Sequence, residues 1–298
     1  MTKEKFSLQR FAAENGATTS ADLAPEISID FTSRLNDNIT EFQRLLGINE
    51  MMAMPEGAAI KIYKTTVASL AAQVGEGEDI TATKVSRALA QTIAMTLKKY
   101  RRVTTAEAIQ KFGRTIAIND CDDKLVAAIQ KDIKKDFYTT LATGTGTGTA
   151  GANLQQACAN AWAKLQEVFE DTDATPVFFI HPTDAANYLG SAGVTVQTAF
   201  GMSYLQNFLG IGNAVISPQL TAGTVIATAS ENLNGAYVPA SGSDLAQTFG
   251  LTSDATGMVG MTHNAKTGNA TVETLILSCV KFFPEVLDKV VKVSISAE

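Results

Sequence analysis

The chain has 298 residues, a net charge of −6 and a pI of about 5.1, and this length suits one large or two modest domains. The acidic balance excludes wholesale binding of nucleic acid through net charge. Only 18% of the residues are charged. Either other protein covers much of the surface, or a large core lies beneath a surface rich in Ser, Thr and Gly, and composition fits both interpretations.

Membrane and secreted proteins are not indicated by the sequence. No run of about 18 apolar residues is present to span a membrane. Residues 1–14 are charged and lack the apolar centre of a signal peptide. Cys121, Cys158 and Cys279 are an odd, scattered set without a CxxC pair, which is typical of reduced thiols in an intracellular protein.

Charge is distributed unevenly along the chain. Residues 165–265 contain eight Asp or Glu and no Lys or Arg, whereas residues 84–136 contain twelve Lys or Arg and six Asp or Glu. The two segments either attract each other between subunits of an oligomer or form two separately solvated faces.

The N-terminal part predicts an arm followed by a helix. Residues 1–24 are polar and small, so we expect a mobile or partner-bound arm. A helical pattern opens at Pro25 and ends at Gly47, and residues 51–57 are expected to be a linker. The apolar positions of this helix are Ile27, Phe31, Leu35, Phe42 and Leu46.

The next segment predicts a long β-hairpin. Ala59–Val67 alternates as a strand, and Ala90–Thr105 is expected to return as its partner. Together Ala58–Thr105 form two arms with an acidic tip inside Ala71–Thr83. Because an isolated hairpin is marginally stable, a long one needs a surface to lie against. The tip residues are Gly75, Glu76, Gly77, Glu78 and Asp79.

A long central helix is predicted over Asn119–Ala142, after a short helix at Ala106–Gly113. We expect Asn119 or Asp120 to cap its start and Gly144 to end it. At about 1.5 Å per residue it would be roughly 36 Å long. Its apolar stripe recurs every four residues: Leu125, Ile129, Ile133, Phe137 and Leu141.

The second half predicts a compact αβ region, followed by another hairpin. Gly144–Gly151 is expected to be a flexible Gly/Thr connector. In the second hairpin, Gly268 and Asn269 are expected to have positive φ. The predicted segments are a helix at Asn153–Glu170, a strand at Pro176–Ile180, a short helix at Pro182–Leu189, strands at Leu209–Ser217 and Thr224–Ala229, hairpin arms at Gly257–His263 and Ala270–Phe283, and a last strand at Val290–Ile295.

No motif predicts catalysis, a cofactor or a metal. Gly146-x-Gly148-x-x-Gly151 matches a dinucleotide fingerprint, but a helix precedes it where a strand is required. His181 and His263 lack partners at zinc or triad spacing. The tip carboxylates Glu76 and Glu78 suit a contact better than acid–base work.

The densest basic cluster surrounds Tyr100. Its charges contact either phosphate or an acidic protein surface, and in an alternating strand they divide between two faces. We take them as candidates for ion pairing between subunits: Lys98, Lys99, Arg101 and Arg102.

The order of these segments resembles that of the major capsid proteins of tailed phages, which have the Hong Kong 97-type fold. VGEGEDI at Val74–Ile80 resembles the tip of the family's extended loop, and Asn119–Ala142 resembles its spine helix. PVFFIHPTDAANYL at Pro176–Leu189 and LGIGNAVISPQLTAGTVIATA at Leu209–Ala229 resemble its axial domain. The segment Leu275–Ile295 resembles its closing strands. The resemblance covers the chain from Ala24 onward.

The resemblance implies an α+β capsid fold without cofactors. Some family members carry a long N-terminal scaffolding segment, whereas here about 50 residues precede the hairpin, so the scaffold is expected to be a separate protein or absent. Nothing marks the Lys–Asn cross-link of other members. The implied domains are an N-terminal arm and helix (1–54), an extended loop (55–105), a peripheral domain (106–150 and 257–298) with its spine helix (119–142), and an axial domain (151–256).

The implied function is that of a major capsid protein of a tailed double-stranded DNA phage. Subunits would form hexamers and pentamers of an icosahedral head, assembled in the host cytoplasm and found in the virion. Portal, scaffold and decoration proteins are expected partners, with packaged DNA contacted without sequence specificity and no membrane. The alternatives are an encapsulin-like nanocompartment shell, another virion protein such as a tail tube, and a soluble enzyme with an unrecognised site.

Overall fold

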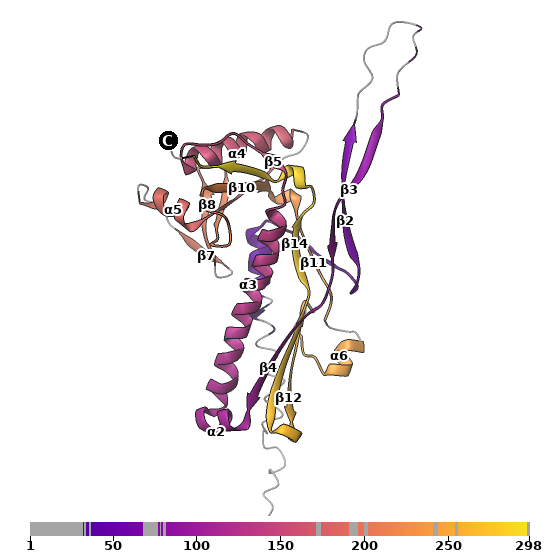
Figure 1. Ribbon diagram of the computed structural model, residues 1–298, viewed down its shortest axis with the longest axis vertical. Helices are drawn as coiled ribbons and strands as arrows, with labels where there is room; N and C mark the ends of the chain where they lie inside the picture. Colours follow the sequence, from indigo (N-terminus) through magenta and orange to yellow (C-terminus); the bar gives the residue numbers. More distant parts are fainter. Residues whose placement is uncertain are drawn as a thin grey trace, which may run out of the picture.

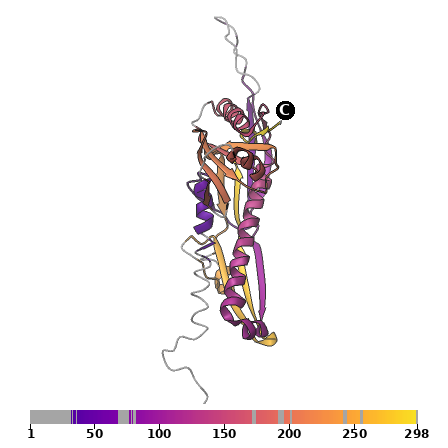
Figure 2. The same cartoon turned by 90° about the vertical axis from the view of Figure 1, so that its left-hand side faces the viewer.

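The computed structural model describes residues 37–67, 82–170, 174–190, 196–199, 202–240, 244–253 and 256–296. It also describes five single residues: Thr32, Arg34, Leu35, Gly77 and Asp79. It is an elongated mixed α and β molecule. Figures 1 and 2 show a compact domain at one end, a long helix beside strands at the other, and a hairpin that extends past the compact domain. The predicted N-terminal arm lies outside the described residues.

The compact domain is built on a seven-stranded sheet in the order β5-β15-β10-β6-β9-β8-β7. Helices α4 (Leu154–Val168) and α5 (Pro182–Leu189) cover one face, and Asn153 caps α4 by accepting a hydrogen bond from the backbone N–H of Gln156. The strands are β5 (Gly146–Thr147), β6 (Pro176–Ile180), β7 (Gln197–Ala199), β8 (Met202–Phe208), β9 (Gly212–Ile216), β10 (Thr224–Ala229) and β15 (Val291–Ser294).

Both faces of this sheet are buried, which explains the continuous apolar run of β6. Phe178 and Ile180 pack with α4 and α5, whereas Val177 and Phe179 pack with the long helix on the other face. The sequence predicted β6, β10 and α5 with these bounds. It missed β7 and β8, whose Gln, Ser and Asn residues interrupt the alternating pattern.

The connector at residues 144–151 is an ordered edge of this sheet and not a flexible linker. Strand β5 pairs in parallel with β15. A Cβ on Gly146 would lie 2.7 Å from the carbonyl oxygen of Val290, and one on Gly151 would lie 2.3 Å from the backbone nitrogen of Ala157. Close approach of backbones therefore requires these glycines. Strand β15, at the end of the segment assigned by sequence to the peripheral domain, lies in this sheet.

The long helix α3 (Cys121–Leu141) follows α2 (Ala106–Arg114) and one π-helical segment, η1 (Thr115–Asp120). The sequence predicted α3 and its buried stripe correctly. It was wrong about the cap, because Asp120 is already helical and makes no side-chain capping bond. The helix ends three residues before Gly144, whose missing Cβ leaves room for Val290.

Two three-stranded sheets run beside α3. One has the order β12-β13-β4, formed by β12 (Val259–Lys266), β13 (Thr271–Ser278) and β4 (Lys98–Thr105). In its turn the positive φ falls on Ala270, at 49°, and not on the predicted residues. The other sheet has the order β1-β11-β14, formed by β1 (Met51–Ala53), β11 (Leu233–Tyr237) and β14 (Val280–Pro284).

Strand β1 corrects the expected linker at residues 51–57, since it pairs in parallel with β11. The short run Met51–Ala53 lacks an alternating pattern, so its sequence does not indicate a strand. Strand β11 and the short helix α6 (Asp244–Phe249) were also missed.

The predicted hairpin is shorter than expected. Strand β2 (Ala59–Val67) pairs with β3 (Val85–Ala94) and not with a strand that continues to Thr105. The chain leaves the hairpin at Met95 and Leu97, which are buried, and β4 then joins a different sheet. Alternation continues through both strands, so the sequence pattern did not show the break.

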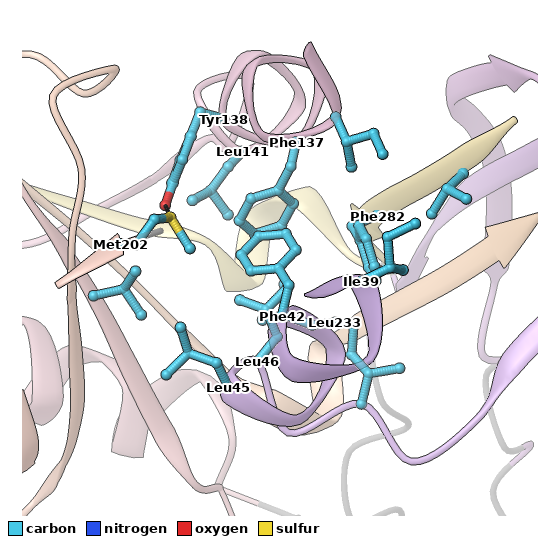
Figure 3. Packing of buried hydrophobic residues seen from close by; sticks show 14 of the residues in the cluster. Ile39, Phe42, Leu45, Leu46, Phe137, Tyr138, Leu141, Met202, Leu233 and Phe282 are labelled. Carbon is cyan, nitrogen blue, oxygen red and sulfur yellow. Dashed lines mark hydrogen bonds between the residues drawn. The ribbon is translucent and has the colours of Figure 1, made fainter. Parts of the chain in front are cut away.

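The largest core joins the N-terminal helix to α3 and the compact domain. Residues 37–45 are helical, and Gly47 follows with φ of 75° as predicted for the end of this helix. Phe42 lies between Phe137 of α3 and Phe282 of β14, with ring centroids 5.5 and 5.0 Å apart, both edge to face (Figure 3). The Tyr138 hydroxyl points to Met202 Sδ at 3.2 Å in the same view.

Candidate interaction surface

The hairpin β2–β3 is anchored at its base and exposed beyond it. Ile62, Met95 and Leu97 are buried together with Phe283 of β14. Further out the apolar side chains are uncovered, including Val67 at 51%, Val85 at 60% and Leu89 at 52% exposure. Figure 1 shows this arm standing away from the body of the molecule. This exposed apolar arm is therefore a candidate interaction surface.

An ion pair holds the base of the hairpin against the body of the molecule, and a groove lies between them. Lys64 Nζ lies 2.5 Å from Asp288 Oδ2, and hydrogen bonds from Lys64 and Thr145 lower the pKa of Asp288. Arg87 stacks over the ring of Tyr63 at 4.0 Å. This open groove lies between the hairpin base and the body. Its lining includes Tyr63, Lys64, Arg87, Phe283, Glu285 and Asp288.

The predicted tip residues are only partly described. Gly77 has φ of 86°, which favours glycine, and Asp79 is exposed. Gly75, Glu76 and Glu78 lie outside the described residues, so their role as contact residues stays a prediction.

Strand β4 divides the predicted basic cluster between two faces. Lys98, Tyr100 and Arg102 lie on the half-buried face, and Lys99 and Arg101 lie on the exposed one. Arg101 pairs with Glu273 of the neighbouring strand β13, with 2.6 Å between Nη2 and Oε1. Among the residues that the structure describes, Lys99 has no carboxylate within 4 Å. The expected contacts of this cluster with another subunit stay a prediction.

The inner face of β4 binds carboxylates of α3. Lys98 Nζ lies 2.6 Å from Asp132 and 2.9 Å from Asp136, which also pairs with Lys281. Burial alone would raise the pKa values of both carboxyls, but hydrogen bonds from Lys98, Tyr100 and Lys281 outweigh it and lower them. Burial and the bond to Asp132 raise the pKa of Tyr100. These contacts hold α3 against the strands.

A second polar cluster lies at the start of α3. Asp122 is fully buried; its Oδ2 lies 2.8 Å from His263 Nε2, and its Oδ1 lies 3.3 Å from Arg102 Nε. Arg102 also donates to the carbonyl of Ala117. In the sequence, Asp122 stands out only as an acidic residue in the first turn of the predicted helix, where the helix dipole favours an anion. No spacing signal reveals this cluster, because its members come from α3, β4 and β12.

The described residues offer little for catalysis. No group of three His, Cys, Asp or Glu side chains among them is placed to hold a metal. His181 caps α5 by accepting the backbone N–H of Thr183. Cys158 is buried, which raises its thiol pKa to about 12, whereas Cys121 is exposed. No described helix is long and apolar enough to cross a membrane.

Solved structures share the architecture of most of the chain. A cyanophage A-1(L) capsid protein has a TM-score of 0.51 at 13% identity, with 89% of this chain and 94% of that chain covered. The encapsulin of the holo-SrpI complex from Synechococcus elongatus has a TM-score of 0.51 at 10% identity, with 83% and 85% covered. The capsid protein of an empty GTA particle also has a TM-score of 0.51 at 10% identity, with 86% and 90% covered.

The chain has the Hong Kong 97-type capsid fold. No protein-family model and no curated protein matches its sequence. The structural neighbours with this capsid fold form shells and are not enzymes. They include both capsids and an encapsulin, so the capsid fold by itself does not separate the two kinds of shell.

Proposed function

We propose that this chain is the major capsid protein of a tailed double-stranded DNA phage. The observation that carries the proposal is the hairpin β2–β3, which exposes Val67, Val85 and Leu89 on a chain with a capsid fold. Such an arm gains a partner surface only when it lies over a neighbouring subunit. Subunits assemble into hexamers and pentamers, which close into an icosahedral head.

In this proposal the elements have the roles that the resemblance to capsid proteins implies. The hairpin is the extended loop, α3 is the spine helix, and the compact domain is the axial domain near the centre of a capsomer. The predicted tip, Gly75 to Asp79, contacts a neighbour. Interfaces of this kind bury more than about 2,000 Å² per subunit in total.

The basic residues of β4 divide between two roles in the proposed shell. Lys98 and Arg102 hold α3 within the subunit, as their contacts with Asp136 and Asp122 indicate. On the exposed face, Lys99 is proposed to pair with an acidic neighbour, and Arg101 would do so only by sharing or leaving its partner Glu273 in the same chain. Residues 165–265, which lack Lys and Arg, supply acidic surface. Portal, scaffold and decoration proteins are further proposed partners in the virion, which is assembled in the host cytoplasm.

Electron microscopy of the purified protein tests this proposal. We expect wild-type chain, alone or co-expressed with its neighbouring genes, to form closed shells or rings of five and six subunits. Deletion of residues 71–83 should leave a folded subunit, with an unchanged circular dichroism spectrum, that assembles badly. The control is Phe249→Ser, which changes an exposed apolar residue outside the hairpin and should still assemble. Normal shells from the deletion variant would contradict the proposed role of the hairpin.

A nanocompartment shell is the second candidate, favoured by the equal TM-score of the encapsulin. The contents of the particles separate the two candidates. Nucleic-acid absorbance in the shell fractions of the native particle supports the capsid, whereas a co-purified protein cargo without nucleic acid supports the nanocompartment. A chain that stays monomeric even with its neighbouring genes and turns over a substrate would support neither.

A further inference from the structure

The charges of α3 are segregated by its packing. The helix contains four Asp and four Lys, so its side chains sum to zero. Every one of its carboxylates meets a cation from another segment. The pairs are Asp122 with Arg102 and His263, Asp123 with Arg34 at 3.0 Å, Asp132 with Lys98, and Asp136 with Lys98 and Lys281.

Three lysines of α3 lie on its exposed side. Lys124, Lys131 and Lys135 are separated by seven and four residues, which places them on one face of a helix over about 16 Å. In the described part of the chain none of them has a carboxylate within 4 Å. Ala127 and Ala128 are exposed between them. We call Lys124, Lys131 and Lys135 the lysine strip.

We infer that the lysine strip binds the phosphate backbone of enclosed nucleic acid without reading its sequence. This inference rests on the proposed function, since a closed shell is what keeps nucleic acid next to α3. Figure 1 shows α3 along one long flank of the molecule, beside β4 and β12. Because the three lysines are exposed, a rod-like ligand that lies along this helix can reach all of them. The proposed contact involves only the three lysines of the strip, so it is compatible with the net charge of −6 of the whole chain.

The chemistry of the strip fits phosphate better than a protein surface. Protein interfaces are built around buried aromatic and apolar anchors and are depleted in lysine. The strip combines lysines with alanines and has no large apolar side chain, in contrast to the hairpin with Val85 and Leu89. The strip also has a local electrostatic effect: burial and the positive charge of Lys131 lower the pKa of the neighbouring Lys134. Lysine binds phosphate as a point charge and releases counterions.

Titration of labelled DNA with unassembled chain tests the inference. The probe is a fluorescent duplex of about 30 base pairs of random sequence, with anisotropy read from about 25 to 200 mM KCl. The strip variant is Lys124→Gln, Lys131→Gln and Lys135→Gln together. The matched control is Lys111→Gln, Lys164→Gln and Lys266→Gln, which removes the same charge elsewhere on the surface. Circular dichroism confirms that both variants fold.

We expect the strip variant to bind at least about tenfold more weakly at 50 mM KCl and to lose about 2.7 from the slope of log affinity against log salt. The single variant Lys131→Gln should lose about 0.9 from that slope, and the control should lose little. Equal losses of DNA affinity in the strip and control variants would show that binding depends on net charge alone, and this would overturn the inference. Unchanged DNA binding by the strip variant would overturn the inference too. If that variant binds DNA normally but fails to assemble, the lysine strip is a contact between subunits and not a DNA contact. Electron microscopy of the same variants after assembly tests shell formation separately.

Discussion

The carboxylate of Asp122 lies 2.8 Å from Nε2 of His263, a residue 141 positions further along the chain. Both side chains are almost completely buried, at 0% and 6% exposure. Arg102 of β4 reaches the other oxygen of the same carboxylate. One buried carboxylate therefore ties the start of α3 to two strands of the sheet β12-β13-β4.

Replacement of Asp122 by Asn should destabilise the subunit strongly. The change leaves the buried part of Arg102 without its counter-charge, and breaking a buried ion pair costs about 3–5 kcal/mol. The free energy of unfolding of unassembled subunits in denaturant measures this loss. The neighbouring change Asp123→Asn is the control, because its pair with Arg34 is half exposed and should be worth less than about 1 kcal/mol. Equal losses from the two variants would show that the buried cluster contributes no more than a surface pair.

The contacts of Lys98 with α3 predict a loss of stability in acid. The pKa values of Asp132 and Asp136 are lower in the folded chain than in the unfolded one. Their contribution is therefore fully present above about pH 4 and is lost as pH falls through the lowered folded-state values. Unfolding free energies measured between neutral pH and about pH 2 should show this decline.

The double variant Asp132→Asn and Asp136→Asn should flatten that decline, because it removes the two carboxyls that take up protons on unfolding. The control pair Asp37→Asn and Asp244→Asn changes exposed carboxylates elsewhere and should keep the wild-type steepness. An equally steep decline in the Asp132 and Asp136 variant would assign the acid sensitivity to other groups.

Alanine should destabilise the subunit at Gly151 but not at Gly268. A Cβ on Gly151 would lie 2.3 Å from the backbone nitrogen of Ala157 in α4, which cannot move without shifting the helix. Overpacking of this kind costs about 1–3 kcal/mol. Gly268 has no atom within 4 Å of such a Cβ, so Gly268→Ala should be neutral within about 0.5 kcal/mol. Thermal unfolding measures both, and a neutral Gly151→Ala would show that the segment at residues 144–151 is as flexible as its composition suggests.

Periodicity predicted the elements that are buried along one stripe or over a continuous run. Helix α3 and strands β2, β6 and β10 are of this kind, and their bounds follow from apolar spacing. What periodicity does not contain is the choice of partner strand. The alternation of residues 90–105 continues through Met95 and Leu97, so only the burial of these two side chains shows that the hairpin ends there.

The candidate site was predictable to a similar extent. The exposed hairpin and the two faces of β4 follow from alternation. The partners of Lys98 and Arg102 are 20 to 38 residues away on another element, and sequence separation does not identify them. The lysine strip likewise requires knowing that Asp132 and Asp136 face the strands.

Phe42 should be the most sensitive position of the N-terminal helix. Its ring is fully buried and lies edge to face with Phe137 and Phe282, so it joins the helix at residues 37–45 to α3 and β14 (Figure 3). Phe42→Ala removes these contacts and leaves a cavity, at a cost of about 3–5 kcal/mol. Phe249→Ala, at a phenylalanine with 46% exposure on α6, is the matched control and should cost less than about 1 kcal/mol. Limited proteolysis should then cleave the Phe42→Ala variant first within residues 32–50, because that helix has lost its main anchor on the body. A variant that unfolds at the wild-type denaturant concentration and keeps this segment protected would show that Leu35, Ile39 and Leu46 suffice to hold it.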